Sequence, residues 1–175
     1  MNVMQRIVIL GNAGSGKSTL ARALGQRLGL PVVHLDRLFW EPGWAKAPTH
    51  VFRARVSEAI SGERWICEGN YHRQTFDLRL PRADLVIWLD TGPIRCLARV
   101  VMRSALNRPR VDLPEGCVEK LDADFLAFLN YVRTFDREKR PGIEDHRLAL
   151  AAHVPVVRLR GTRQISRFLE APLAG

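Results

Sequence analysis

Short apolar runs alternate along the chain with stretches of helical spacing. The apolar runs occupy residues 6–10, 31–36, 64–68, 83–90 and 154–159. Runs this short and this continuously apolar are typical of parallel strands that are buried on both faces. Apolar residues at helical spacing predict helices from residue 17 to Gly29 and over 50–61, 93–104, 118–139, 143–152 and 162–171. We therefore predict a three-layer α/β/α fold, with a five-stranded parallel sheet and right-handed crossovers.

Capping and breaking residues set the expected helix boundaries. Thr49 is expected to cap the helix over 50–61, and Pro93 suits the first position of the helix over 93–104. Residues 105–117 contain two prolines and one glycine and are expected to form a loop. Pro141–Gly142 is expected to separate the last long helix from a short one.

Length and composition agree with one domain, residues 1–175, that carries a lid insertion over about 105–140. No apolar stretch is long enough to span a membrane, and because the first strand is expected within the first ten residues, we expect no signal peptide. The three cysteines, Cys67, Cys96 and Cys117, have neither CxxC nor zinc spacing. We therefore expect a reducing, cytoplasmic location, and either a monomer or a homodimer.

The net charge of +9 first suggests a nucleic-acid partner. However, 23 of the 27 basic residues are arginine, and they are spread along the chain without a basic tail. Arginine grips phosphate oxygens with a planar fork, so this excess serves a small phosphorylated ligand as readily as DNA. Nucleic-acid binding is an alternative that the sequence does not favour.

The motif GxxxxGK[ST] lies between the first strand and the first helix. Its glycines allow positive φ angles, so that successive backbone N–H groups can point at phosphate oxygens near the positive end of a helix. Lysine supplies a cation to the β- and γ-phosphates, and the serine hydroxyl helps to hold Mg²⁺. The motif predicts an ATP site with Mg²⁺, formed by Gly11, Asn12, Ala13, Gly14, Ser15, Gly16, Lys17, Ser18 and Thr19.

The remaining sequence narrows the class of P-loop protein. It has no NKxD-like guanine reader and no LSGGQ-like transporter signature, and it is short for a helicase core. A small kinase needs only the phosphate loop, an acceptor pocket and an arginine-bearing lid. Asp36 is expected at the carboxyl end of the second strand, where ligands bind in such sheets. It could accept the proton of an acceptor hydroxyl, help to order Mg²⁺, or merely cap a loop.

Aromatic and basic side chains surround the expected acceptor position. Trp40 and Trp44 follow Asp36 in a loop. They could stack on a base or a sugar, or pack on the core and so fix the loop. Tyr71 and Arg73 could line the same pocket. Arginines near the end of the long helix, Arg133, Arg137 and Arg140, could close onto the phosphates as part of the lid, together with Arg108 and Arg110.

Residues 83–90, Pro93, Arg99 and Arg103 resemble the strand–helix segment of adenylate kinases and their relatives. The resemblance implies that both arginines clamp phosphates and act in catalysis with Lys17. It also implies that Glu68 holds Mg²⁺, that Glu68, Gly69 and Asn70 border the acceptor, and that Gly161 and Thr162 contact the adenine. The next residues, Asn70–Tyr71–His72, depart from the adenylate kinase pattern, which argues against an adenylate kinase acceptor pocket.

Residues 34–44, 68–71 and 116–122 are similar to the DNA topology modulation, or FlaR-related, proteins, which belong to the adenylate-kinase-like P-loop group. We therefore expect a nucleotide-kinase-like P-loop fold and an enzyme that transfers the γ-phosphate of ATP to a nucleoside, a nucleotide or another hydroxyl compound. Two alternatives stay open: a DNA-associated regulator that uses ATP as a switch, and a nucleotide-binding module without turnover.

Overall fold

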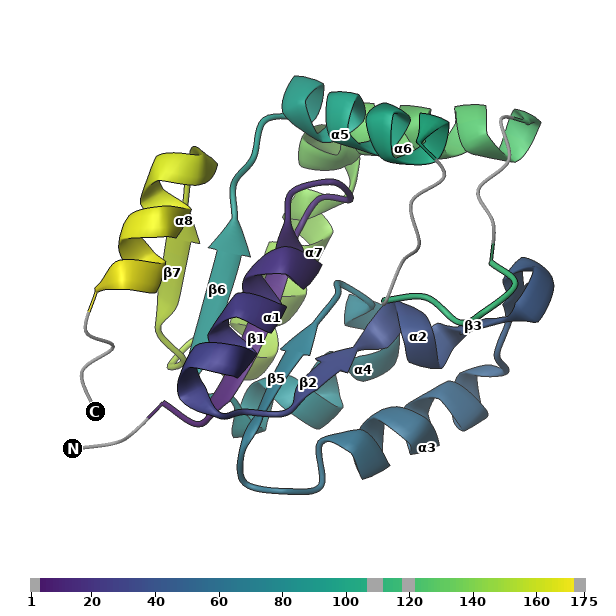
Figure 1. Ribbon diagram of the computed structural model, residues 1–175. Coiled ribbons are helices and arrows are strands. Elements are labelled where there is room, and N and C mark those ends of the chain that lie inside the picture. Colours follow the sequence, from purple (N-terminus) through teal and green to yellow (C-terminus); the bar gives the residue numbers. More distant parts are fainter. Residues whose placement is uncertain (1–3, 107–111, 118–121, 172–175) are drawn as a thin grey trace.

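A parallel sheet in the strand order β2-β5-β1-β6-β7 forms the centre of the protein (Figure 1). This description rests on a computed structural model that describes residues 4–106, 112–117 and 122–171. The predicted sheet is confirmed, with β1 in the middle between β5 and β6. The strands are β1 (Arg6–Gly11), β2 (Val32–His34), β5 (Trp65–Glu68), β6 (Leu85–Leu89) and β7 (Val156–Leu159).

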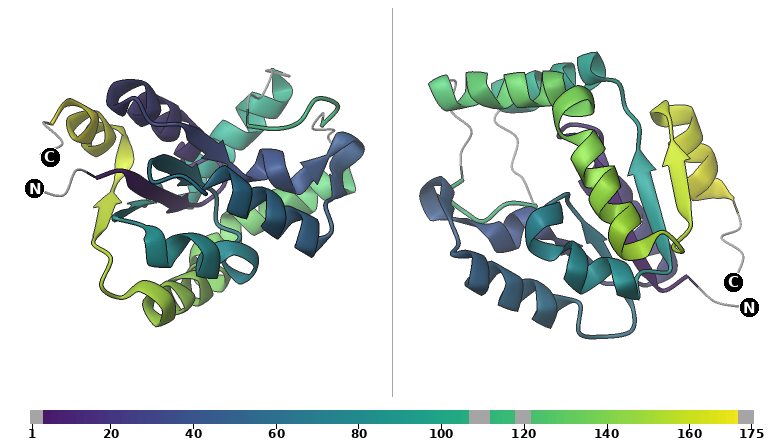
Figure 2. Two further views of the ribbon diagram at one scale, coloured as in Figure 1. Left: turned by 90° about the horizontal axis from the view of Figure 1, so that it is seen from below. Right: turned by 180° about the vertical axis from the view of Figure 1, so that it is seen from behind.

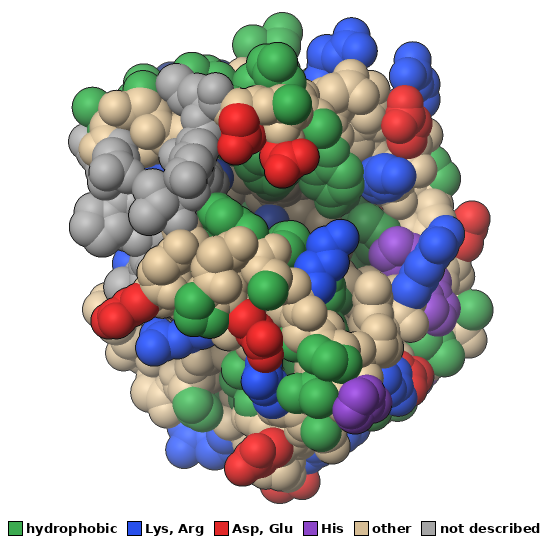
Figure 3. All heavy atoms as spheres, turned by 90° about the vertical axis from the view of Figure 1, so that its right-hand side faces the viewer, with side chains coloured by type: hydrophobic (Ala, Val, Ile, Leu, Met, Phe, Trp, Pro, Cys, Tyr) green, Lys and Arg blue, Asp and Glu red, His purple; other side chains and the backbone are tan. Residues whose placement is uncertain are grey.

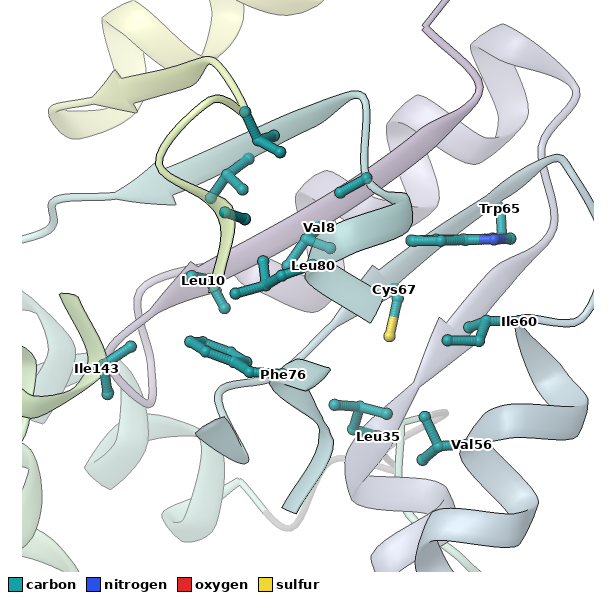
Figure 4. Close-up of a cluster of buried hydrophobic side chains, with 14 of the residues drawn as sticks. Val8, Leu10, Leu35, Val56, Ile60, Trp65, Cys67, Phe76, Leu80 and Ile143 are labelled. Atoms are coloured by element: carbon teal, nitrogen blue, oxygen red, sulfur yellow. The ribbon is translucent and has the colours of Figure 1, made fainter. Parts of the chain in front are cut away.

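Helices cover both faces of this sheet (Figure 2). On one face lie α1 (Lys17–Leu28) and α8 (Gly161–Glu170), which bury apolar side chains against Ile7 and Ile9 of β1. On the other face lie α3 (Thr49–Ala59), α4 (His72–Arg79) and α7 (Arg140–Ala151), which pack against Val8 and Leu10. Figure 4 shows this second cluster, in which Phe76 of α4 lies close to the strand residues. Alternate residues of β1 therefore contribute side chains to two separate cores, as expected of a central strand.

Two further helices, α5 (Pro93–Ala105) and α6 (Ala123–Glu138), lie beyond the carboxyl ends of the strands (Figure 1). They pack on each other through Cys96, Val100, Phe125 and Val132, and Ala13 of the phosphate loop packs against the same cluster. The nucleotide loop is therefore in direct contact with the pair of helices that follows β6.

The structure corrects several predicted boundaries. The second strand ends at His34, and the segment continues as α2 (Leu35–Phe39), so Asp36 lies in a helical turn rather than at a strand end. A small hairpin of β3 (Trp40–Glu41) and β4 (Ala45–Lys46), joined by the 3-10 turn η1 (Pro42–Trp44), replaces the expected loop. The prediction that Thr49 caps α3 is wrong, because Pro48 occupies the N-cap.

Proline lies in the first turn of two further elements, α7 and a short 3-10 turn. Pro141 lies in the first turn of α7, so Pro141–Gly142 begins a helix instead of separating two; proline is tolerated there because first-turn N–H groups lack intrahelical partners. Leu80–Arg82 forms a second 3-10 turn, η2, directly after α4. The predicted lid over 105–140 includes Arg108 and Arg110, which lie outside the described residues. Within the described ranges, no helix is long and apolar enough to cross a membrane.

Candidate active site

The predicted phosphate loop connects β1 to α1, and its glycines have the expected backbone geometry. Gly11, Gly14 and Gly16 have φ angles of 146°, 75° and 104°. A Cβ on Gly14 would lie 2.5 Å from the carbonyl oxygen of Cys96, so only glycine allows the loop to approach α5 this closely. Gly16 is the N-cap of α1 without a side-chain cap, and the first turn of α1 contains no acidic residue. The positive end of α1 is thus prepared for an anion, which fits the phosphates of ATP.

Lys17 and Asn12 show how the loop is held. The Lys17 ammonium donates a hydrogen bond to the carbonyl oxygen of Asn12 at 2.9 Å, so the cation lies over the loop itself. Asn12 is buried, and its side-chain amide donates to the carbonyl oxygen of Val132 in α6 at 2.8 Å. Asn12 therefore connects the loop to α6. Thr19, the last residue predicted for the ATP site, is exposed on α1.

The Ser18 hydroxyl lies between two buried carboxylates. Its Oγ is 3.0 Å from Oε1 of Glu68 and 3.0 Å from Oδ2 of Asp112. One hydroxyl proton can be donated to only one of them, so a cation would relieve the charge of the pair. Hard oxygen atoms of this kind are the ligands that Mg²⁺ prefers, with phosphate oxygens and waters completing its shell. The residues fit Mg²⁺ with Ser18 and Glu68 as predicted, and with Asp112 as a further candidate that the sequence did not reveal.

His34, the last residue of β2, contacts Glu68. Its Nδ1 lies 2.8 Å from Oε1 of Glu68, so it orients the carboxylate beside Ser18. Glu68 is only 3% exposed, and a buried carboxylate needs hydrogen-bond partners in the protein. His34 and Ser18 are two such partners.

Asp36 lies against an aromatic wall. The hydroxyl of Tyr71 donates to its Oδ1 at 2.7 Å. The ring of Phe39 lies 4.8 Å from that of Tyr71 and 4.9 Å from that of Trp40, between centroids. Trp44 continues the wall at 5.3 Å from Trp40. Figure 3 shows the face with α6 at the top and α3 at the bottom, and a hollow bordered by hydrophobic and basic side chains between them.

The residues around Asp36 divide into two groups. Tyr71 binds Asp36, and the ring of Phe39 connects Tyr71 to Trp40 and Trp44, so these predicted residues belong to one aromatic group. Asn70 instead turns its side-chain amide to the backbone of Gly11, and Arg73 is exposed on α4. Gly69 has a φ of 127°, and a Cβ there would lie 3.0 Å from Leu35.

The predicted arginines are not all at the phosphate loop. Arg99 reaches it, with Nη1 donating to the carbonyl oxygen of Ser15 at 3.1 Å, and Arg103 is half-buried one turn further along α5. Arg133 is exposed and binds Asn130, and Arg137 is exposed and pairs with Glu138. The structure therefore brings Arg99 to the loop and leaves Arg133 and Arg137 on the solvent side of α6.

A cavity of about 410 Å³ lies beside the phosphate loop, where β6 and β7 end. The carbonyl oxygen of Ser15 accepts a hydrogen bond from Thr91, one of the lining residues, which places the cavity next to the loop. Gly161 belongs to the lining, as expected of an adenine-binding loop, while Thr162 is exposed next to it. The lining residues are Asp90, Thr91, Gly92, Pro93, Ile94, Arg95, Arg160 and Gly161.

Asp90, one of the lining residues, forms ion pairs with two arginines. Asp90 accepts hydrogen bonds from Arg140 at 2.7 Å and from Arg160 at 3.1 Å. Burial alone would raise the pKa of Asp90, but the hydrogen bonds and charges of the two arginines hold it below its ordinary value. The Arg140 guanidinium also lies over the ring of Trp88, 5.3 Å from its centroid. Arg140 thus anchors the start of α7 to β6 in the described structure.

Comparison with known proteins identifies the relatives of this site. The shikimate kinase of Symbiobacterium thermophilum is 30% identical over 124 residues, which cover 62% of this chain and 71% of the relative. The crystal structure of shikimate kinase from Bacteroides thetaiotaomicron has a TM-score of 0.58 at 19% identity and covers 95% of both chains. Shikimate kinase from Acinetobacter baumannii in complex with shikimate has a TM-score of 0.56 at 17% identity, covering 95% of this chain and 92% of the other.

No protein-family model matches the sequence. The specific resemblance to the DNA topology modulation proteins is not supported by these relatives, whereas the broader P-loop kinase prediction is confirmed. The match in sequence, the shared fold and the phosphate loop agree on one assignment. The chain belongs to the shikimate kinase-like family of P-loop kinases, and it is an ATP- and Mg²⁺-dependent phosphotransferase that acts on a small molecule.

Proposed function

We propose that the protein phosphorylates a hydroxyl group of a small ring compound, with Asp36 as the general base. The observation that carries this proposal is a chain of contacts from the phosphate loop to Asp36. Asn70 binds the backbone of Gly11 in the loop, Tyr71 is the next residue, and the Tyr71 hydroxyl donates to Asp36. A carboxylate on the acceptor side of the loop is where a kinase needs a proton acceptor.

The proposed reaction is a single phosphoryl transfer. Asp36 accepts the proton of the acceptor hydroxyl as that oxygen bonds to the γ-phosphorus, and the bond to the ADP oxygen breaks. ATP supplies the phosphoryl group, and Mg²⁺ offsets the negative charge of its phosphates. Lys17 and Arg99 stabilise the charge that develops on the transferred group. Residues 105–140 would act as a lid that excludes water, with Arg133 and Arg137 moving toward the phosphates only on closure.

The aromatic wall supports a ring-shaped acceptor, because flat apolar faces pack well against the face of a ring. Shikimate is a hydroxylated ring, and the relatives reported above are shikimate kinases. It is therefore the first acceptor to test. Nucleosides, nucleotides and other small hydroxyl compounds follow in the same assay.

A coupled measurement of ADP release across these acceptors tests the proposal, with Lys17→Ala and Asp36→Asn as controls. We expect one acceptor to raise ADP release several-fold, and both substitutions to abolish the increase. Equal rates for the native protein and Lys17→Ala across the panel would refute the proposed activity. Full activity of Asp36→Asn would remove only the base assignment.

A DNA-associated role is a second candidate because of the net charge of +9. Several arginines are already engaged in ion pairs within the described structure, including Arg6, Arg53, Arg55, Arg82, Arg147 and Arg158. This pairing reduces the positive charge that is available to phosphates of a duplex. A DNA affinity that falls steeply with salt concentration would support this role, and an absence of such binding would remove it.

A further inference from the structure

We propose that Tyr71 is a positioning residue that orients the carboxylate of Asp36, and that the buried Arg79 holds Tyr71 in the conformation that this requires. The inference rests on the proposed function, because it assigns a role to Tyr71 only if Asp36 is the base.

The contact between the two side chains is short and directional. The Tyr71 hydroxyl donates to Oδ1 of Asp36 at 2.7 Å, a normal length for a hydrogen bond between a hydroxyl and a carboxylate. Such a bond fixes the rotation of the carboxylate, and therefore the direction from which it meets an acceptor proton. The Tyr71 ring is held by Phe39 and Phe52, whose centroids lie 4.8 Å and 5.1 Å away.

The backbone of Tyr71 is unusual. Its φ of 33° and ψ of 41° place it in the left-handed region, which residues other than glycine rarely adopt. Within the described ranges, Trp44 is the other non-glycine residue with a positive φ, and it lies in the same aromatic wall. A conformation of this kind persists only where the surroundings hold it, and such positions gather at functional sites.

Arg79 holds the backbone of Tyr71 in this conformation. It is fully buried in α4, and its Nη2 donates to the carbonyl oxygen of Gly69 at 2.7 Å and to that of Asn70. Its Nε donates to Oγ1 of Thr75 at 3.1 Å, and the same Oγ1 donates to the carbonyl oxygen of Tyr71 at 2.9 Å. One guanidinium therefore fixes the two carbonyls before Tyr71 directly, and the Tyr71 carbonyl through Thr75.

The charges around Tyr71 keep it a donor. Asp36 faces it from α2, Glu68 from β5 and Tyr131 from α6, and Arg79 binds the preceding backbone from α4. Burial, followed by the charge of Asp36, raises the pKa of Tyr71 far above its ordinary value. Tyr71 therefore keeps its proton throughout the range in which a kinase works, and in the structure it donates that proton to Asp36.

The test compares two matched variants, because the chain has two tyrosines and both are half-buried in this region. Tyr71→Phe removes the hydroxyl that binds Asp36, and Tyr131→Phe removes one that lies near Asn70. The titration of the Asp36 side-chain carbon is followed by NMR in the native protein and both variants, which needs no acceptor. We expect Tyr71→Phe to raise the pKa of Asp36, because a donated hydrogen bond favours the carboxylate, and Tyr131→Phe to leave it unchanged.

Kinetics with the acceptor found in the ADP-release assay provide a second readout. We expect Tyr71→Phe to lower kcat by about 10- to 100-fold with little change in KM, and to move the acidic limb of the pH profile upward. Arg79→Lys keeps the charge but cannot reach all three oxygens, so it should move the titration of Asp36 in the same direction.

The inference is overturned if Asp36 titrates identically in Tyr71→Phe and the native protein, or if both tyrosine variants shift it equally. Full activity of Asp36→Asn would instead reject the base itself, so the two failures are distinguishable. If Arg79→Lys does not fold, the comparison of Tyr71→Phe with Tyr131→Phe decides alone.

Discussion

The side-chain amide of Asn70 makes two hydrogen bonds with the backbone of Gly11. Its Oδ1 accepts from the Gly11 N–H at 3.2 Å, and its Nδ2 donates to the Gly11 carbonyl oxygen at 2.9 Å. Gly11 begins the phosphate loop, and Asn70 follows β5, the neighbour of β1 in the sheet. One side chain therefore joins the nucleotide loop to the segment that carries Tyr71.

Replacing Asn70 by alanine should weaken both stability and ATP binding. The substitution leaves the N–H and carbonyl of Gly11 without these partners, which costs about 1–3 kcal/mol when the groups are buried. Thermal unfolding and calorimetric titration with ATP measure the two effects. Asn130→Ala is the matched control, because the Asn130 side chain is exposed and accepts a hydrogen bond from the exposed Arg133. Equal unfolding temperatures and equal ATP affinities of the two variants would contradict the role of Asn70 in holding the phosphate loop.

Gly14→Ala should abolish nucleotide binding. The new Cβ would meet the Cys96 carbonyl oxygen at 2.5 Å, and the φ of 75° is unfavourable for alanine. The loop must then move away from α5, which disturbs the N–H groups that would bind phosphate. Gly62→Ala is the control, since a Cβ there meets nothing within 4 Å. ATP-dependent stabilisation in a thermal shift assay should be lost in Gly14→Ala and kept in Gly62→Ala; if Gly14→Ala keeps it, the close packing on α5 is not required.

The strands and the phosphate loop could be predicted from the sequence because both are local signals. A strand buried on both faces is a continuous apolar run, and the glycines of the loop follow from its backbone geometry. Helix α4 was missed for a physical reason. Its buried face contains Thr75 and the charged Arg79 beside Phe76, so it lacks an apolar repeat.

The partners within the site could not be predicted, because they depend on side chains that are distant in sequence. Asp112 lies 94 positions from Ser18, and Tyr71 lies 35 positions from Asp36. The sequence also gives no sign that His34 of β2 contacts Glu68, because Glu68 lies on the neighbouring strand β5. The sequence thus identified most of the participants near the loop, and the tertiary structure was needed to pair them.

Asp112→Asn should raise the Mg²⁺ concentration that half-saturates ATP binding. The carboxylate lies 3.0 Å from the Ser18 hydroxyl, and an amide oxygen is a weaker ligand than a charged carboxylate. We expect an increase of about 10- to 100-fold, as is typical when one supporting group of a metal site is changed. A Mg²⁺ titration at fixed ATP measures it, and Asp124→Asn, an exposed residue in the first turn of α6, is the control. An unchanged midpoint would show that Asp112 does not serve the metal.

Asp90→Asn should lower stability at neutral pH and make it less sensitive to acid. The folded pKa of Asp90 lies below its ordinary value, since Arg140 and Arg160 outweigh the opposing effect of burial. Its contribution is therefore complete above the unfolded pKa of about 3.9, and it is lost as the pH falls through the lower folded pKa.

The difference in unfolding free energy between the native protein and Asp90→Asn should be about 1.5–3 kcal/mol, the usual worth of a hydrogen bond to a charged group. It should stay constant from pH 7 to about pH 5 and shrink below about pH 4. Urea unfolding over this range measures it, with Asp145→Asn, an exposed aspartate on α7, as the control. A difference that persisted undiminished in acid would mean that Asp90 acts through its shape and packing, not through its charge on Arg140.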